Sequence, residues 1–309
     1  MPAIQRITNE VFGKRTPVTI ERMEDGRSTI VYRLRRGTET FYLRVLPEVG
    51  DSFAPEAYVH TLLRQRGVHV PEVLYVEHCN EALHRSIMVT GEIPGKPISH
   101  LGYGEEAKDI LIEAGRELAM INCVQVEGFG WIQRDQSHVT RLEAQQSSNR
   151  AFLLEDLDRY LSLLGGTVLT AHDVRTIRDI VSEHSAWLSV DQAHLAHGDF
   201  DVTHIYQAHG RYTGIIDFGE IRGTGPYYDL GHFRLHDGET ASYRALSFLL
   251  AGYQQMAPLP PGYAQQIAFV SLLIGIRFLA RGLHRFTDHT RSHARSSIKT
   301  DIELLRREV

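Results

Sequence analysis

The chain has 309 residues, of which 42% are hydrophobic, and it carries a formal net charge of −5 at pH 7. This length and hydrophobic content favour a large core divided into two compact units, whereas the negative charge argues against a surface that binds nucleic acid. With only two cysteines, Cys79 and Cys123, the sequence indicates neither a disulfide framework nor a thiolate metal site.

The first ninety residues predict a lobe rich in strands. Runs of Val, Ile, Thr, Tyr and Leu are separated by Asp25-Gly26 and Arg36-Gly37, which favour hairpin turns. A helix is predicted to begin at Asp51 or Ser52 and to end near Arg66, and two further strands follow it. The expected strands are residues 17–23, 28–35, 40–46, 71–77 and 86–90.

From Pro94 onward the pattern is mainly helical, and a hairpin over residues 195–218 is the only expected interruption. A hinge is predicted at 91–95. We therefore expect an α+β protein with a domain over residues 1–93 and a second, mainly helical domain over residues 94–309. The expected helices are residues 105–123, 149–164, 172–188, 228–235, 240–255, 263–285 and 296–307.

No stretch of the chain is predicted to cross a membrane. The most apolar run, residues 267–276, has about half of the roughly 20 residues that span a bilayer, and Arg277 follows it. This run is predicted to be a buried helix. Residues 1–10 lack the apolar core of a signal peptide. We expect a cytoplasmic monomer with no membrane partner.

The segments His197-Gly198-Asp199 and Asp217-Phe218-Gly219 carry the strongest functional signal. They combine an acid in a loop, the candidate metal ligand His204 five residues later, and a second acid at the end of a short apolar strand. Phosphoryl transfer requires such groups, because one must orient the attacking hydroxyl and others must hold Mg²⁺ on the nucleotide phosphates. Either tripeptide alone is better explained as an ordinary polar turn, but their order, spacing and apolar flanks favour catalysis.

These residues resemble the aminoglycoside phosphotransferase-like family of small-molecule kinases, which are relatives of the protein kinases. In that family a His-Gly-Asp-x4-Asn loop carries the catalytic aspartate and a metal-binding asparagine, and an Ile-Asp-Trp/Phe segment carries the second metal ligand. The resemblance implies a two-lobe kinase-like fold with a five-stranded antiparallel sheet and one helix in its first lobe. It also implies that Asp199 is catalytic, that Asp217 binds metal, and that Asp229 buttresses the catalytic loop.

His204 occupies the position of the family's asparagine, and three interpretations of it stay open. The imidazole could ligate the metal directly, although Mg²⁺ prefers oxygen ligands. It could instead hydrogen-bond the catalytic loop while Asp217 and water hold the metal. In the third interpretation the site is inactive.

The resemblance implies that the first lobe binds ATP or GTP together with Mg²⁺. Ser28 and Thr29, in the first hairpin, could close over the phosphates, although a plain turn fits them too. Arg44 occupies the position at which most of the family has a phosphate-binding lysine. Some members, including hygromycin phosphotransferases, also have arginine at this position. Glu56 is the expected partner of Arg44. The alternative for this pair is an exposed arginine and an acid favoured by the helix dipole.

The adenine base is expected at the hinge of this first lobe. Thr90, Gly91 and Glu92 would offer backbone groups to the base. Ile30 and Leu43 would line the apolar slot around it.

The acceptor is expected to be a cationic small molecule. Residues 199–239 contain seven acidic and three basic side chains, a local net charge of −4 that attracts cations. Together with the resemblance this predicts an aminoglycoside, and Arg44 and the segment 128–131 favour a hygromycin-like one. The expected contacts to its ammonium groups are Asp201, Glu220, Asp237 and Glu239.

Other functions remain as alternatives. The chain could phosphorylate a macrolide, choline, homoserine or a sugar, or it could be a catalytically silent protein that binds a nucleotide. A protein kinase is disfavoured, because only about ten residues separate Asp217 from the helix predicted at 228–235, which leaves no room for an activation loop.

Overall fold

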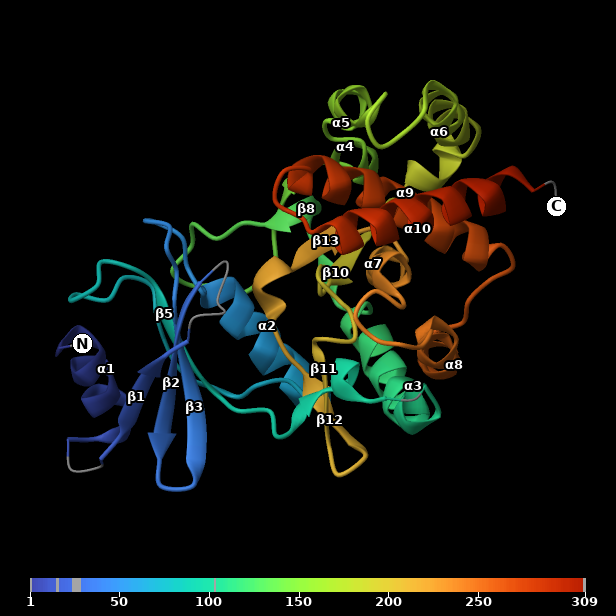
Figure 1. Ribbon diagram of the computed structural model, residues 1–309. Coiled ribbons are helices and arrows are strands. Elements are labelled where there is room, and N and C mark those ends of the chain that lie inside the picture. Colours follow the sequence, from blue (N-terminus) through green and yellow to red (C-terminus); the bar gives the residue numbers. More distant parts are fainter. Residues whose placement is uncertain (1, 15–16, 24–28, 103, 308–309) are drawn as a thin grey trace.

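The computed structural model describes residues 2–14, 17–23, 29–102 and 104–307, which form two lobes of mixed α and β structure (Figure 1). The first lobe contains the predicted five-stranded antiparallel sheet, in the order β1-β2-β3-β5-β4. Its long runs of β-branched and aromatic residues explain why the sequence predicted each strand. The strands are β1 (Thr19–Arg22), β2 (Ile30–Arg36), β3 (Glu39–Val45), β4 (Val73–Glu77) and β5 (Ile87–Gly91).

A helix that the sequence analysis did not predict, α1 (Pro2–Phe12), covers the outer face of this sheet (Figure 1). Ile4, Ile7 and Phe12 are buried in one cluster with Leu34 and Leu43 of the sheet. The spacing of these apolar residues is helical. In the sequence, residues 1–10 were interpreted only with respect to a signal peptide.

The predicted helix after β3 is α2 (Ala54–Gln65), which lies between the sheet and the second lobe (Figure 1). Its first turn contains Pro55, whose fixed φ suits that position. The hydroxyl of Ser52 accepts a hydrogen bond from the amide of Ala54 at 3.1 Å. On the other side, Val59 and Leu63 are fully buried in a cluster that consists mainly of second-lobe residues.

The predicted hinge connects β5 to β6 (Lys96–Pro97), which pairs with β11 (Ile205–Ala208) of the second lobe. Gly95 has φ +103°, and a Cβ atom there would lie 2.0 Å from the carbonyl oxygen of Gln207. Glycine is therefore required where the connection docks on the second lobe. We propose residues 93 and 94 as the boundary between the domains.

The second lobe contains the expected helices, with differences at several ends. The expected helix over 149–164 is broken because Asp156 adopts a left-handed conformation with φ +59°. The one expected from residue 240 begins at 246, and the last one begins at 288, where the hydroxyl of Thr287 caps it. The α-helices are α3 (Gly104–Ile121), α4 (Asn149–Leu153), α5 (Leu157–Leu164), α6 (Ala171–Glu183), α7 (Tyr228–His236), α8 (Leu246–Met256), α9 (Tyr263–Gly282) and α10 (Asp288–Arg306).

The expectation that one hairpin is the only β structure in this lobe was wrong. The hairpin exists as β11 and β12 (Arg211–Ile215), but a second five-stranded sheet has the order β7-β10-β13-β8-β9. Its strands have two to four residues, which is too short for an alternating pattern to be recognised. They are β7 (Gln125–Val126), β8 (Phe129–Ile132), β9 (Ala144–Gln146), β10 (Ala193–Ala196) and β13 (Arg222–Thr224).

Among the described helices, α9 alone is long and apolar enough to span a membrane. In its most apolar window, however, 67% of the residues are buried inside the lobe. It packs against α7, α5 and α10. The helix is thus a core element of the second lobe, as the sequence predicted for residues 267–276.

Candidate active site

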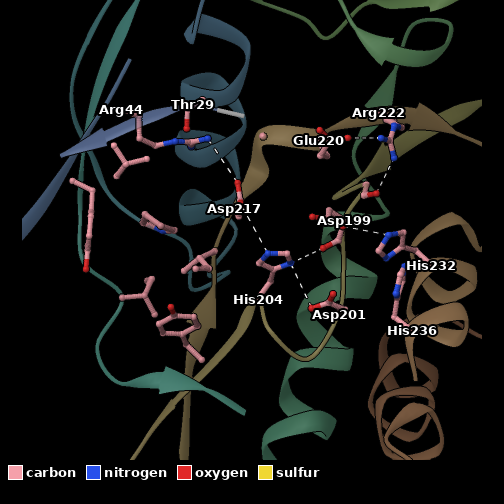
Figure 2. A pocket seen from close by; sticks show the side chains of 18 of the residues that line it. Thr29, Arg44, Asp199, Asp201, His204, Asp217, Glu220, Arg222, His232 and His236 are labelled. Atoms are coloured by element: carbon pink, nitrogen blue, oxygen red, sulfur yellow. Dashed lines mark hydrogen bonds and ion pairs between the residues drawn. The ribbon is translucent and has the colours of Figure 1, made fainter. Parts of the chain in front are cut away.

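A cavity of about 890 Å³ lies between the lobes and is lined by residues of both. Figure 2 shows Thr29 and Arg44 at one side, Asp217 and His204 in the middle, and Asp199 and His232 beyond them. The first pair comes from the strand-rich lobe. The other four come from the catalytic loop, the segment after β12, and α7. The predicted catalytic and metal-binding side chains therefore share one cavity.

The predicted catalytic loop, residues 197–204 between β10 and β11, is held by Asp229 at the start of α7. The backbone amides of His197 and Gly198 each donate a hydrogen bond to this carboxylate at 2.9 Å, and the side-chain amide of Asn122 donates another. Asp229 is fully buried. Gly198 has φ +90°, and a Cβ there would lie 1.8 Å from the carbonyl oxygen of Glu220. The loop conformation thus depends on glycine, and Asp229 has the buttressing position that the resemblance implied.

Asp199 points from this loop into the cavity toward His232 (Figure 2). Its Oδ1 lies 3.3 Å from Nε2 of His232, whose Nδ1 lies 3.2 Å from the carbonyl oxygen of Phe200. Burial opposes charge on both groups, but their pairing outweighs it. It holds the pKa of Asp199 well below its usual range and raises the pKa of His232. The pairing therefore favours an ionised Asp199 and a protonated His232.

His204 and Asp217 form the second part of the site. Nδ1 of His204 donates to the carbonyl oxygen of Asp199 at 2.7 Å, so the lone pair of a neutral ring is on Nε2. That atom lies 3.8 Å from Oδ2 of Asp217. Asp217 has φ +67°, which is uncommon for a residue with a side chain and occurs at functional sites. An imidazole nitrogen and a carboxylate on one side of the cavity fit a divalent cation.

Asp201 is the other acid near His204, with its Oδ1 3.7 Å from Nδ1 of the ring. The same Oδ1 accepts a hydrogen bond from the backbone amide of Thr203 at 2.7 Å. Asp199, Asp201 and His204 also form a group close enough to share an ion. We favour the pair of His204 and Asp217 as the metal site, because Nδ1 of His204 and Oδ1 of Asp201 already have protein partners.

Arg44 and Glu56 form the expected ion pair, and Nη2 of Arg44 lies 3.7 Å from Oδ1 of Asp217. Burial alone would lower the pKa of Arg44, but the carboxylates of Glu56 and Asp217 raise it. Only 1% of the Glu56 side chain is exposed, so the guanidinium is held from the protein side and directed at the cavity. His60, one turn after Glu56, also lines the cavity and was not predicted.

Most of the residues expected to bind the nucleotide lie at the cavity. Thr29, Thr90 and Glu92 line the cavity, whereas Ser28 lies outside the described residues. The amide of Glu92 donates to the carbonyl oxygen of Thr40 at 3.3 Å, and its carboxylate accepts a hydrogen bond from Tyr42. The backbone amide of Glu92 therefore already has a partner.

The expectation that Ile30 and Leu43 line the adenine slot was wrong. Leu43 is fully buried on the sheet face covered by α1, and Val31 and Tyr42 line the cavity instead. Successive residues of a strand face opposite sides of the sheet. Because Arg44 faces the cavity, its neighbour Leu43 cannot.

The four acids expected to bind the acceptor are not gathered as free carboxylates. Glu220 lines the cavity but pairs with Arg222 at 2.6 Å. Asp237 is buried outside the cavity lining, where it accepts a hydrogen bond from the amide of Ala245 at 2.7 Å, just before α8. Glu239 binds Nδ1 of His236 at 2.6 Å. Asp201 belongs to the turn described above.

Several cavity residues were missed by the sequence analysis. His232 is the most important, and its only signal was its place three residues after Asp229 on the same helix. Arg222 was counted only as a charge, yet it donates to the carbonyl oxygen of Gly198 and lies 4.1 Å from the ring centroid of Trp131. Arginines of α9 also line the cavity.

A comparison with known families agrees with this geometry. Residues 19–264 match the model of the phosphotransferase enzyme family. The chain belongs to this family. The described site thus lies in a phosphotransferase, and the match covers both lobes. None of the curated proteins compared with this phosphotransferase matches it in sequence.

Solved structures share the fold of this phosphotransferase at low sequence identity. A thermostable variant of aminoglycoside phosphotransferase APH(4)-Ia, in ternary complex with ADP and hygromycin B, is 18% identical with a TM-score of 0.72, over 99% of this chain and 100% of that one. A protein of Thermobifida fusca, provisionally named a fructosamine-3-kinase, is 16% identical with a TM-score of 0.66, over 98% and 99%. At these identities the likeness shows the kinase-like fold alone.

Proposed function

We propose that this phosphotransferase moves the γ-phosphoryl group of ATP or GTP to a hydroxyl of a small molecule. One observation carries the proposal. Arg44, Asp217, His204 and Asp199 line a single cavity in the order in which phosphates, metal and acceptor hydroxyl must follow one another (Figure 2). The hinge lies at the nucleotide end of this order, and α7 and α9 lie at the other end.

Asp199 orients the acceptor hydroxyl in this proposal. A bond forms between the hydroxyl oxygen and the γ-phosphorus while the bond to the β–γ bridging oxygen breaks, and the hydroxyl proton passes late to Asp199. His232 lowers the pKa of Asp199, which makes the carboxylate a weak base. It is suited to positioning rather than to early proton removal.

Arg44, held by Glu56, contacts the phosphates in this proposal, and Thr29 and Ser28 close over them. His204 and Asp217 hold Mg²⁺, which when bound would neutralise charge on the phosphates. The hydrogen bond from His204 to the catalytic loop is compatible with ligation, because it leaves Nε2 unprotonated in the neutral ring.

The acceptor is proposed only as a small molecule with a hydroxyl group. APH(4)-Ia is known in complex with hygromycin B, but the contacts expected for an aminoglycoside have partners within this protein or lie outside the cavity lining. A monomer and a cytoplasmic location remain part of the proposal.

The replacement Asp199→Asn tests the proposal while preserving the size of the side chain. We expect the transfer of labelled γ-phosphate to a pooled extract of small metabolites to fall on the order of 10²-fold or more. The binding of ADP, measured by calorimetry, should persist. Unchanged transfer by a folded Asp199→Asn protein would refute the role of Asp199. Wild-type protein that binds ADP with Mg²⁺ but transfers phosphate to no acceptor would support the silent nucleotide-binding alternative.

A further inference from the structure

The end of the cavity beyond Asp199 is formed largely by α9 and the turn after it. Arg277, Arg281 and Arg285 follow one another at intervals of four residues and all line the cavity. Arg277 and Arg281 share one face of α9, because residues four apart in a helix do so, whereas Arg285 lies in the turn after α9. Next to them, the rings of Phe278 and Phe286 stack with centroids 4.3 Å apart. The acceptor end thus has a row of guanidinium groups beside an apolar wall.

The other cationic groups at this end are paired with carboxylates. Arg222 pairs with Glu220, His232 with Asp199, and His236 with Glu239. These pairs include Glu220 and Glu239, two of the four acids that the sequence analysis had treated as available.

The guanidinium groups of Arg277, Arg281 and Arg285 have fewer carboxylate partners than these other cations. Arg277 donates to the carbonyl oxygen of Phe152 and lies 4.0 Å from a carboxylate oxygen of Glu155. Arg281 donates to the hydroxyl of Tyr160, and Arg285 donates to the carbonyl oxygen of Arg281. Neither Arg281 nor Arg285 has a carboxylate within 4.0 Å in the described parts of the chain. Two exposed guanidinium groups at the acceptor end are therefore without an ion-pair partner among the described residues, although the Tyr160 hydroxyl that accepts from Arg281 itself donates to Asp156 at 3.4 Å.

These arginines lie at the wrong end of the cavity to serve the nucleotide. The hinge residues Thr90 and Glu92 belong to the first lobe, and Arg44 already faces the metal pair from that side. Arg277 is mostly buried, and burial lowers its pKa. Three guanidinium groups at one end of a cavity, of which Arg281 and Arg285 are exposed to solvent, favour the binding of an anion there.

We propose that the acceptor is a hydroxyl compound that carries a negatively charged group, a carboxylate or a phosphate, bound by Arg281 and Arg285. The inference rests on the proposed phosphotransferase function and names the substrate class of the same site. The planar guanidinium groups suit either anion, because both can accept two parallel hydrogen bonds. The acceptor's hydroxyl then lies at Asp199, and its anionic group lies along α9. A polycationic aminoglycoside would be repelled at this end.

The charge of the acceptor can be tested before its identity is known. A small-molecule extract is separated by ion exchange into cationic, neutral and anionic fractions, and each is incubated with the wild-type protein, Mg²⁺ and ATP labelled in the γ-phosphate. We expect labelled product from the anionic fraction. Phosphatase treatment of that fraction beforehand removes phosphate esters and distinguishes a phosphate from a carboxylate. Product from the cationic or neutral fraction alone would overturn the inference but leave the proposed function intact. Transfer to no fraction would refute the proposed function and the inference with it.

Variants test whether α9 supplies the binding site. We expect Arg281→Gln combined with Arg285→Gln to lower transfer to the anionic fraction, at subsaturating concentration, by about tenfold or more. Arg175→Gln, at an exposed position of α6, is the matched control and should match the wild type. Both proteins should bind ADP as the wild type does. Full transfer by the double variant would contradict the proposed site. Lost ADP binding would indicate misfolding, in which case Arg281→Gln alone removes one of the two charges with a smaller change, and full transfer by it would contradict the role of Arg281.

Discussion

At the scale of single residues, Asp199 differs from an isolated loop carboxylate because it is paired with His232. The motif located the aspartate, but the ring that determines its charge state comes from another helix. His232 uses both nitrogens as donors, toward Oδ1 of Asp199 and the carbonyl oxygen of Phe200. The pair therefore links the orientation of the catalytic carboxylate to α7, and its contribution to stability depends on pH.

The sign of this pH dependence follows from the two pKa shifts. The raised pKa of folded His232 gives stability that is complete below the unfolded value of about 6.5 and is lost as the pH rises through the folded value. The lowered pKa of Asp199 gives stability above about 3.9 that is lost only in strong acid. The pair therefore stabilises the protein from moderately acidic to neutral pH.

We expect His232→Gln to reduce the free energy of unfolding by about 1–2 kcal/mol near pH 6, less than for a fully buried pair because 42% of the Asp199 side chain is exposed. Near pH 9 the difference should shrink. Urea unfolding at both pH values measures it, with His138→Gln, at an exposed loop position, as the control. An equal loss at both pH values would show that His232 acts by packing alone.

At the scale of elements, the start of the loop at residues 197–204 is held by Asp229 of α7. Asp229 accepts hydrogen bonds from three N–H donors and donates none. In Asp229→Asn one of the carboxylate oxygens becomes an NH₂ group that faces a donor. We expect a loss of about 2–3 kcal/mol in the free energy of unfolding and a fall in kcat of tenfold or more, on the order expected for a displaced catalytic group.

The control for this variant is Asp191→Asn, at an exposed position before β10. Unfolding in urea gives the stability, and transfer under saturating substrate gives kcat. If Asp229→Asn kept wild-type kcat, the loop would be held mainly by other contacts, such as the bond from Arg222 to the carbonyl oxygen of Gly198.

The elements also show what could be predicted from the sequence. The first sheet was predictable, because four of its five strands have five or more residues and lie between clear turns. The second sheet was not, because strands such as β7 and β13 have two or three residues and are defined by their partners rather than by a pattern. The break at Asp156 likewise depends on a single residue in a left-handed conformation.

The site residues likewise divide into those that the sequence predicted and those that it did not. Asp199, His204, Asp217 and Arg44 were placed by motif and spacing, and all four line the cavity. The acids around them were misjudged, because a count of charges along the chain does not show which are already paired. Asp237 illustrates this point, since its carboxylate binds the backbone at the start of α8. The arginines of α9 and of the turn after it lie more than fifty residues beyond the motifs, and only the fold brings them to the site.

At the scale of the whole molecule, α2 of the first lobe contributes to the hydrophobic core of the second, whereas α1 and the first sheet have a buried cluster of their own. Val59 and Leu63 of α2 belong to the same buried cluster as Ile215 and Phe218. The ring of His60 also packs against that of Phe218, with centroids 5.1 Å apart. The proposed boundary at 93 and 94 is therefore not a boundary in the packing, and the lobes should unfold together.

Unfolding followed by two probes tests this expectation. The chain's two tryptophans, Trp131 and Trp187, both lie in the second lobe, so their fluorescence reports that lobe, whereas circular dichroism reports both. We expect the two urea transitions to coincide, because neither lobe can expose the shared cluster alone without losing apolar burial.

Val59→Ala should shift both transitions together by about 1–3 kcal/mol, while Val49→Ala, at a site with 75% exposure, should shift neither. ADP at about one hundred times its Kd should stabilise both by about 2.7 kcal/mol. A second midpoint seen only by circular dichroism would mean that the strand-rich lobe unfolds independently, and the core shared through α2 would then contribute little to coupling the lobes.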